Sequence, residues 1–129
     1  MANAVYPITK KTMLDALLAL GTLKLALVDT AIYTYSAADD FYSDVSAGVV
    51  GTPQALTGIT TTDGALDANT ATFTSVSGAS VEALVLYVDT GNPATSPVLA
   101  YIDTGQTGLP VTPNGGNISY SPGINIFQL

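Results

Sequence analysis

Two aspartates of this chain stand in the same short phrase, and the phrase has the residue types for acid catalysis. Asp89 lies in Tyr-Val-Asp-Thr-Gly at residues 87–91, and Asp103 lies in Tyr-Ile-Asp-Thr-Gly at residues 101–105. An apolar pair followed by Asp-Thr-Gly is typical of aspartic proteases, in which two carboxylates about 3 Å apart share one proton. Two neighbouring strands that each end in a turn have the same phrase, because Asp and Gly hold turn backbones.

The strands that carry the two aspartates decide between these interpretations. The apolar run Ser80–Asp89 predicts a central strand covered on both faces, and Val98–Ile102 predicts its antiparallel partner. Across that hairpin Asp103 lies about five positions from Asp89, which places the carboxylates roughly 17 Å apart. We therefore expect no catalytic dyad within one chain and no enzyme, while a dyad shared between two copies stays open.

Composition removes most other kinds of catalytic and metal site. The chain has no cysteine and no histidine, which excludes thiolate metal sites, cysteine nucleophiles and a Ser-His-Asp triad. The acidic clusters at 39–44 and 63–69 offer oxygen ligands, but neither fits the twelve-residue calcium loop. No glycine-rich phosphate loop with a lysine is present. We expect no catalytic residue, no metal ligand and no cofactor.

The charge of the chain limits the classes of partner that we expect it to bind. Only 10% of the 129 residues are charged, the net charge is −7, and the last of the three lysines is Lys24. Nucleic acid and anionic membrane surfaces are bound through Lys and Arg, so we expect neither as a partner. A surface of Thr, Ser, Asn, Gly and apolar atoms suits packing against other protein, because few charges must be desolvated. We also expect no secretory leader and no membrane span.

Hydrophobic periodicity predicts a single domain over residues 1–129. Short strands punctuated by Gly and Pro indicate an all-β fold, either an antiparallel sandwich or a partly open barrel, with one short N-terminal helix. That helix is expected over Lys10–Leu20, with its leucine stripe in the core. Residues 1–8 are expected to form an extended arm, since Pro7 disfavours the helical conformation at Tyr6.

Weaker patterns predict further strands. Alternating leucines predict a strand over residues 23–28. Short strands are also expected at Ile32–Tyr35, Leu56–Thr60 and Ala71–Val76, and a closing hairpin is expected from Ile118–Tyr120 and Ile124–Phe127.

Tyrosines on these strands are candidates for sugar stacking. Tyr33 and Tyr35 share one side of their expected strand, and Tyr87 is expected to face Tyr101 across the hairpin. Cross-strand packing is the commoner use of such pairs, because tyrosine also serves as an amphipathic packing group.

The second half of the chain carries a recognisable set of segments. They are residues 83–91 (ALVLYVDTG), 94–97 (ATSP), 100–103 (AYID) and 108–116 (GLPVTPNGG), together with 23–30 and the closing 126–129. With these segments the chain resembles a family of small structural proteins of tailed bacteriophages, of the head-decoration or minor tail type. The resemblance covers most of the chain and implies a virion component rather than an enzyme.

Resemblance and low charge together lead to one expectation about function. We expect a capsid decoration or cement protein that binds assembled shell subunits through multivalent contacts, in virions assembled in the host cytoplasm. The candidate segment for grasping the major capsid protein or other virion proteins is Val5, Tyr6, Pro7 and Ile8, with terminal disorder as the alternative. A homo-oligomer is also expected. A tail or head–tail connector component and, in another class, a receptor- or glycan-binding module stay as alternatives.

Overall fold

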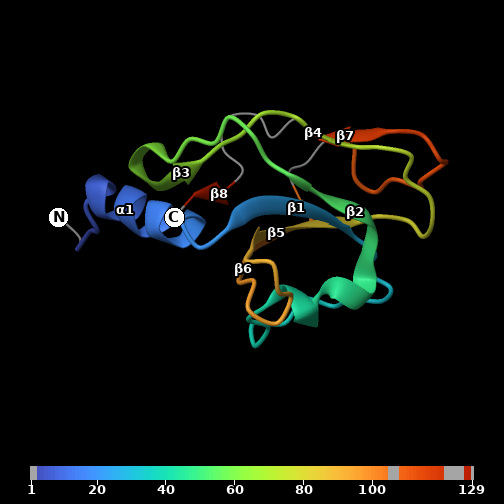
Figure 1. The fold of residues 1–129 in the computed structure, drawn as a ribbon, viewed down its shortest axis with the longest axis horizontal. Coiled ribbons are helices and arrows are strands. Elements are labelled where there is room, and N and C mark those ends of the chain that lie inside the picture. Colours follow the sequence, from blue (N-terminus) through green and yellow to red (C-terminus); the bar gives the residue numbers. More distant parts are fainter. Residues whose placement is uncertain (1–2, 105–107, 121–126, 129) are drawn as a thin grey trace.

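The computed structural model describes residues 3–104, 108–120 and 127–128 and has a mainly-β fold with one short N-terminal helix (Figure 1). The helical elements are α1 (Pro7–Leu18) and the short 3-10 turns η1 (Tyr42–Asp44), η2 (Ser46–Gly48) and η3 (Thr62–Gly64). The strands are β1 (Thr22–Val28), β2 (Val49–Ala55), β3 (Ala65–Leu66), β4 (Ala71–Phe73), β5 (Ala83–Asp89), β6 (Val98–Ile102), β7 (Ile118–Tyr120) and β8 (Phe127–Gln128). Every pairing between these strands is antiparallel, which confirms the expected fold class.

A four-stranded sheet with the order β2-β1-β5-β6 forms the centre of the molecule. β5 is buried along nearly its whole length, and β1 pairs with it from Thr22 opposite Asp89 to Val28 opposite Ala83. A strand that is apolar on both faces needs cover on both sides of the sheet. The central strand, its β6 partner and the alternation of leucines in β1 are confirmed.

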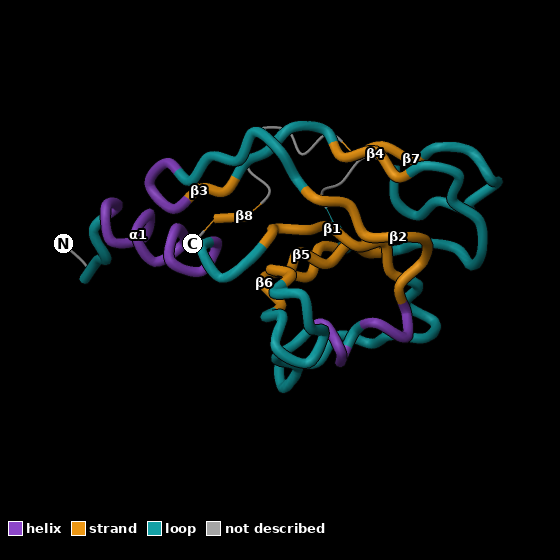
Figure 2. Tube along the Cα trace, in the orientation of Figure 1, coloured by secondary structure: helices purple, strands orange, loops and turns teal. Residues whose placement is uncertain are grey.

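One face of the sheet packs against two short strand pairs. β3 pairs with β8 and β4 pairs with β7, and both pairs lie above the sheet in Figures 1 and 2. The main hydrophobic core fills the space between the two layers, and its members include Leu25, Leu84, Leu86 and Val88 from the sheet and Leu66, Phe73 and Tyr120 from the strand pairs. Burial of these apolar side chains is the principal stabilising term of the fold.

The opposite face of the sheet is covered by the segment between β1 and β2. This segment carries η1 and η2 and lies below the sheet in Figure 1. Tyr33 and Val45 from the segment pack against Val28 and Val85 from the sheet. The sheet is thus covered on both faces, as the apolar pattern of β5 requires.

Residues 32–35, expected to be a strand, form a loop instead. Asp29 turns the chain directly after β1, because its Oδ1 accepts the Ala31 N–H at 3.0 Å and its carbonyl oxygen accepts the Tyr33 N–H at 3.0 Å. An aspartate that satisfies nearby backbone donors in this way competes with strand pairing. The alternating apolar residues of this stretch therefore bury Tyr33 without joining a sheet.

The closing hairpin is also corrected by the structure. β7 pairs with β4, with Tyr120 opposite Ala71, and β8 pairs with β3 rather than with β7. The turn predicted between these two strands lies in residues 121–126, outside the described residues. The strand β2 was not predicted. Gly51 lies inside it with φ 71°, at the irregularity in the β1–β2 pairing. Residues 56–60 make only an isolated bridge, Thr60 with Asp67.

The N-terminal helix begins earlier than expected. α1 starts at Pro7 rather than Lys10, so Pro7 and Ile8 are helical and the extended arm predicted over residues 1–8 is shorter. Proline is favoured in the first turn of a helix, where no intrahelical partner exists for the N–H that it lacks. No helix in the described part of the chain is long and apolar enough to cross a membrane.

α1 projects at one end of the molecule and packs against η3 (Figure 1). Leu14 is its one fully buried side chain, and Leu17 and Leu18 are partly buried against the same core. The expected leucine stripe is therefore confirmed, but it anchors only one side of the helix.

Candidate functional site

Asp89 and Asp103 lie at opposite ends of the β5–β6 hairpin. Ile102 pairs with Leu84, so Asp103 follows at the end where β5 begins, whereas Asp89 is the last residue of β5. Asp103 is therefore level with Ala83, six positions from Asp89, which corresponds to about 20 Å along a strand. The predicted placement at opposite ends of the hairpin is confirmed, and the two carboxylates do not form an acid–base dyad within the chain.

At the Asp89 end of the hairpin, a salt bridge and several hydrogen bonds occupy the polar groups. Lys24 from β1 forms a salt bridge with Asp89, with 2.7 Å between Nζ and Oδ2, and Asp89 Oδ1 accepts the Gly91 N–H at 2.8 Å. The Lys24 ammonium, followed by the Gly91 N–H, holds the pKa of Asp89 below its usual value. The buried Ser96 hydroxyl accepts the Thr90 N–H at 3.0 Å. These contacts give Asp89 a structural role at a turn.

The chain between α1 and β1 presses on the same end of the sheet. A Cβ added at Gly21 would lie 2.1 Å from the carbonyl oxygen of Asp89, so no side chain fits there without a shift of the backbone. Gly21 therefore allows this backbone contact, in addition to its place just after the helix.

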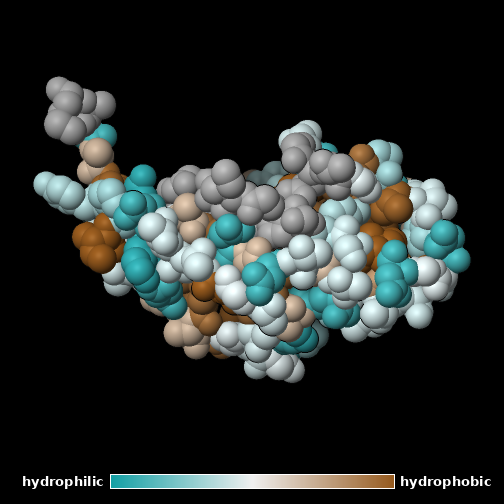
Figure 3. All heavy atoms as spheres, turned by 90° about the horizontal axis from the view of Figure 1, so that it is seen from above, coloured by the Kyte–Doolittle hydropathy of each residue, from teal (hydrophilic) through white to brown (hydrophobic). Residues whose placement is uncertain are grey.

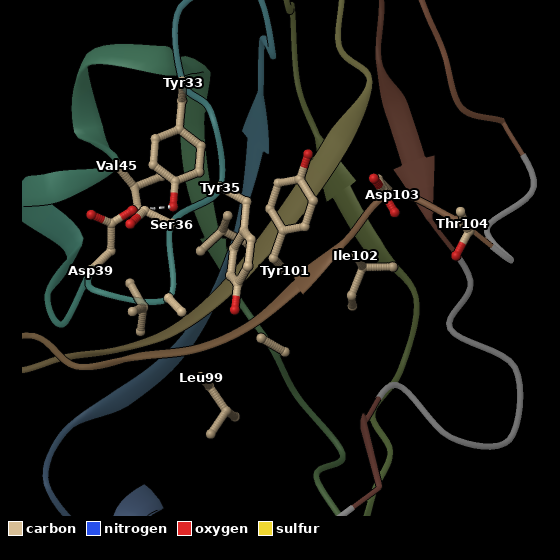
Figure 4. Close-up of a pocket in the computed structure, with 14 residues that line it drawn as sticks. Tyr33, Tyr35, Ser36, Asp39, Val45, Leu99, Tyr101, Ile102, Asp103 and Thr104 are labelled. Atoms are coloured by element: carbon tan, nitrogen blue, oxygen red, sulfur yellow. Dashed lines mark hydrogen bonds between the residues drawn. The ribbon is translucent and has the colours of Figure 1, made fainter.

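The Asp103 end opens into a pocket of about 700 Å³ (Figure 4). One wall is β6 with the two residues that follow it, and the other is the loop between β1 and η1. The lining residues are Tyr33, Tyr35, Ser36, Ala37, Asp39, Val45, Val85, Val98, Leu99, Ala100, Tyr101, Ile102, Asp103 and Thr104. Because the chain has no Lys, Arg or His after Lys24, the lining contains no cationic side chain.

Three tyrosine rings occupy the centre of this pocket. Tyr101 from β6 packs against Tyr35, with 5.3 Å between ring centroids and 34° between planes, and against Tyr33, with 6.3 Å and 55°. Tyr33 is 8% exposed, whereas Tyr35 is 56% exposed. In Figure 4 the rings lie between the carboxylates of Asp39 and Asp103. Tyr35 is therefore the ring most accessible to a ligand, with acidic groups on either side of the cluster.

The carboxylates around the pocket act on the tyrosine hydroxyls. The Tyr33 hydroxyl donates to Asp39 Oδ2 at 2.7 Å, and burial together with this bond raises the pKa of Tyr33 well above its usual value. Burial, and then the negative charges of Asp103 and Glu82, raise the pKa of Tyr101. The phenols of Tyr33 and Tyr101 are therefore neutral near pH 7, and the carboxylates give the pocket a negative electrostatic potential.

A close backbone contact fixes the position of Tyr33. A Cβ added at Gly48 would lie 2.6 Å from the Tyr33 Cβ, and the Gly48 carbonyl oxygen accepts the Asp29 N–H at 2.8 Å. The turn η2 is thus held directly against the start of the pocket loop. Because Gly48 has no side chain, Tyr33 lies close to η2, and its ring packs against Tyr101.

The aromatic pairs differ from the predicted ones. Tyr87 does not face Tyr101, because the pairing of β5 with β6 shifts register and places Tyr87 opposite Val98 and Tyr101 opposite Val85. Tyr87 stacks on Tyr42 instead, with centroids 4.1 Å apart and 15° between planes. The sequence did not predict the pocket. Its tyrosines and aspartates come from two separate segments that the fold brings together beside β6, and their residue types are the only signal that the sequence offers.

The two acidic clusters hold turns of the backbone. Asp44 Oδ2 accepts the N–H groups of Asp40 at 3.1 Å and Phe41 at 3.2 Å, and Asp67 Oδ1 accepts the Ala68 N–H at 2.8 Å. Within residues 3–104, 108–120 and 127–128, no group of three or more acidic side chains is placed to hold a metal ion. The geometry supports the interpretation of these carboxylates as turn formers.

The segment predicted as an interface lies at the projecting end of the molecule. Val5 and Tyr6 precede α1, Pro7 and Ile8 begin it, and all four are exposed. Several of the large apolar side chains that are exposed in the structure lie within the first 20 residues: Val5, Tyr6, Ile8, Met13 and Leu20. Figure 3 shows hydrophobic surface at this end of the molecule, on the left. A role of the segment in binding stays a prediction.

No protein-family model matches the chain, and no curated protein matches it significantly.

Proposed function

We propose that this chain is a structural protein of a tailed-bacteriophage virion and, within the particle, a decoration or cement protein of the capsid. The proposal is carried by the gathering of exposed large apolar side chains at one end of a weakly charged molecule. Apolar surface that projects from a fold, rather than filling it, is typical of a protein–protein contact. The likeness of the sequence to phage structural proteins supports the phage context.

The exposed side of α1 suits a docking helix. Ile8, Thr12 and Ala16 recur with helical spacing on the side away from Leu14, and all three are exposed. The Thr12 hydroxyl already donates to the Ile8 carbonyl oxygen at 2.8 Å. A partner that covers this face therefore desolvates few unsatisfied polar groups. The partner that we propose is a subunit of the assembled shell, most directly the major capsid protein.

Many weak contacts would supply the strength of attachment. The helix face is small, and a single contact of this size binds weakly. When copies associate with one another on a symmetric shell, each further contact forms at a high effective concentration, so the total affinity rises by orders of magnitude. A homo-oligomer is therefore part of the proposal.

A non-enzymatic role is also part of the proposal. The separation of about 20 Å along β5 keeps Asp89 and Asp103 from sharing a proton within one chain. Asp89 is occupied by Lys24, and Asp103 borders the tyrosine pocket. Neither carboxylate has the arrangement that acid–base catalysis requires.

Binding to phage particles tests the proposal. Purified protein is added to heads that lack it, bound protein is measured by co-sedimentation, and its density is located by electron cryomicroscopy. We expect saturable binding on the shell and at least about tenfold weaker binding for Ile8→Asp, because the loss at each contact is multiplied over the contacts.

Ile32→Asp is the matched control for that experiment. Ile32 is 62% exposed and Ile8 is 67% exposed, but Ile32 lies in the loop after β1, away from α1. The control should bind as the parent protein does. Equal binding of the Ile8→Asp and Ile32→Asp variants to heads would show that α1 is not part of the docking surface. Absence of binding of the parent protein to heads would contradict the decoration role.

Two alternatives have distinct outcomes in the same experiments. Density on the tail or at the head–tail junction would identify a tail or connector component. A receptor- or glycan-binding module is favoured only by the exposed ring of Tyr35 in an open pocket, since aromatic rings stack on sugars. A glycan array that gives saturable binding, abolished by Tyr35→Ala, would support that class.

A further inference from the structure

The tyrosine pocket has the dimensions of a ligand site and takes no part in the docking surface proposed for α1. Its volume of about 700 Å³ lies within the range of roughly 300–1,000 Å³ that is usual for binding pockets. It is framed by a rigid contact between Gly48 and Tyr33 and by the β5–β6 hairpin. A preformed pocket of this size has room for several residues of another chain.

The charge of the pocket selects a cation. Asp39 and Asp103 flank the three rings, Glu82 adds its charge near Tyr101, and no cationic lining residue offsets them. The whole chain carries −7, so the field of the rest of the molecule has the same sign. A positively charged group is therefore attracted to this pocket, whereas a carboxylate or phosphate is repelled.

The geometry of the rings favours a planar cation over a spherical one. The centroids of Tyr35 and Tyr101 are only 5.3 Å apart and their planes differ by 34°, so the two rings contact each other and leave no gap for an ammonium group. Tyr35, with 56% of its surface exposed, is the most exposed of the three rings. A guanidinium group stacks flat on the face of such a ring and still donates hydrogen bonds at its edges to carboxylates, which an ammonium group does less well.

The edge of the sheet gives the ligand a backbone to run along. β6 is the last strand of the sheet, and within the described residues the loop covers its outer edge only at the start, where Phe41 bridges Pro97 and the Val98 N–H donates to the Asp40 carbonyl oxygen. From Leu99 onward the strand lines the pocket. An uncovered strand edge accepts an extended peptide through main-chain hydrogen bonds.

These observations converge, and the geometry points to an arginine site: the pocket binds an arginine side chain carried on an extended segment of a partner protein. The guanidinium stacks on Tyr35 between the carboxylates of Asp39 and Asp103, and the partner backbone follows β6. The identity of the partner as a shell or other virion protein rests on the function proposed above. The chemistry of the pocket does not depend on it.

Peptide titration of the free protein tests this inference. The probe is the blocked peptide acetyl-Thr-Val-Arg-Val-Thr-amide, compared with the same peptide containing citrulline, lysine or glutamate in place of arginine. Citrulline has nearly the shape of arginine without its charge. We expect the arginine peptide to shift the amide NMR signals of residues 33–39 and 99–104, with the lysine peptide about threefold weaker and the citrulline peptide about fivefold weaker.

Variants assign the effect to the named side chains. Tyr35→Ala and Asp103→Asn should each weaken the arginine peptide about threefold, while Tyr35→Phe, which keeps the ring, should bind as the parent protein does. Asp63→Asn is the charge-matched control: it also removes one carboxylate but lies in η3, and asparagine tolerates its φ of 54°. Circular dichroism confirms that each variant is folded.

Each of three other outcomes overturns the arginine site. Equal binding of the arginine and citrulline peptides would remove the role of charge. Absence of NMR shifts at residues 33–39 and 99–104 at millimolar concentrations of the arginine peptide would show that the pocket does not bind it. Blocked arginine alone binding as tightly as the peptide would make the ligand a free small cation and remove the strand-edge contact.

Sugar binding is distinguished in the same protein. A glycan that shifts the pocket signals while the arginine peptide does not would assign the pocket to carbohydrate and overturn the inference. The titration uses no phage particles, so its failure leaves the head-binding experiment intact. Failure of the head-binding experiment likewise leaves a positive peptide titration standing.

Discussion

The two copies of the Tyr-apolar-Asp-Thr phrase begin on neighbouring strands and end in different surroundings. The first copy ends the central strand β5, where Lys24 from β1 and the buried Ser96 close around Asp89 and Thr90. The second copy ends the edge strand β6, where Asp103 is exposed and borders an open pocket. The same short sequence motif therefore makes stabilising contacts at one end of the hairpin and borders an open pocket at the other.

The difference shows that strand position, not the local phrase, decides what a carboxylate does. A central strand brings a neighbour on each side, and β1 supplies the lysine that pairs with Asp89. An edge strand has a neighbour on one side only, so within the described residues Asp103 makes no salt bridge. Changes at the Asp89 end should therefore cost stability, and changes at the Asp103 end should cost binding.

The largest effect is expected from Gly21→Ala. The added Cβ would lie 2.1 Å from the Asp89 carbonyl oxygen, and backbone atoms cannot move aside as a flexible side chain can. We expect a loss of about 2–3 kcal/mol in the free energy of unfolding, measured by urea denaturation. Gly116→Ala is the control, because its added Cβ would meet a side-chain atom, Oδ1 of Asn114 at 3.0 Å, rather than the backbone. Equal losses in the two variants would contradict the tight contact at the Asp89 end.

Ser96→Ala should give the next largest effect. Ser96 is 1% exposed, and its Oγ accepts the Thr90 N–H at 3.0 Å and donates to the Asn92 carbonyl oxygen at 2.8 Å. Removal of the buried hydroxyl takes away both hydrogen bonds, so we expect a loss of about 1–2 kcal/mol in the free energy of unfolding. Thr104→Ala, at the other end of the hairpin, should change it by less than about 0.5 kcal/mol. A larger loss at Thr104 than at Ser96 would reverse the comparison.

Lys24→Gln should give a smaller and pH-dependent effect. Lys24 is the main cause of the lowered pKa of Asp89 in the folded state, so the stabilisation is present above the unfolded-state pKa of the carboxyl and disappears as the pH falls through the folded-state value. We expect a loss of about 0.5–1 kcal/mol at pH 7 that shrinks toward zero near pH 2. Denaturation curves across this pH range measure it, and a loss that stays constant with pH would exclude the salt bridge as its cause.

Long apolar patterns made much of the fold predictable. The apolar segments at β1, β5 and β6 are long enough to define strands. The unbroken apolar character of β5 by itself predicts a central strand. The opposite placement of Asp89 and Asp103 followed from those two strands alone. The leucine spacing also predicts the helix but not its start, because Pro7 disfavours the helical conformation at Tyr6 and is at the same time a favoured first helical residue.

The short elements and the pocket depend on contacts that the sequence does not display. β3, β4, β7 and β8 have two or three residues each, too few for periodicity to define partners. The pocket exists because Asp29 turns the chain after β1 and because Gly48 accepts the close approach of Tyr33. Neither contact leaves a periodic pattern, so the alternation of Tyr33 and Tyr35 predicts a strand instead of a loop.

A matched pair of variants, Asp89→Asn and Asp103→Asn, tests the division between the two ends most directly. Each removes one carboxylate from the same phrase, and both are measured for the free energy of unfolding and for affinity to the arginine peptide. We predict that Asp89→Asn loses about 1 kcal/mol of stability and keeps its affinity, while Asp103→Asn keeps its stability and binds the peptide about threefold more weakly. Equal losses of stability in the two variants, or a loss of affinity in Asp89→Asn as large as that in Asp103→Asn, would contradict it.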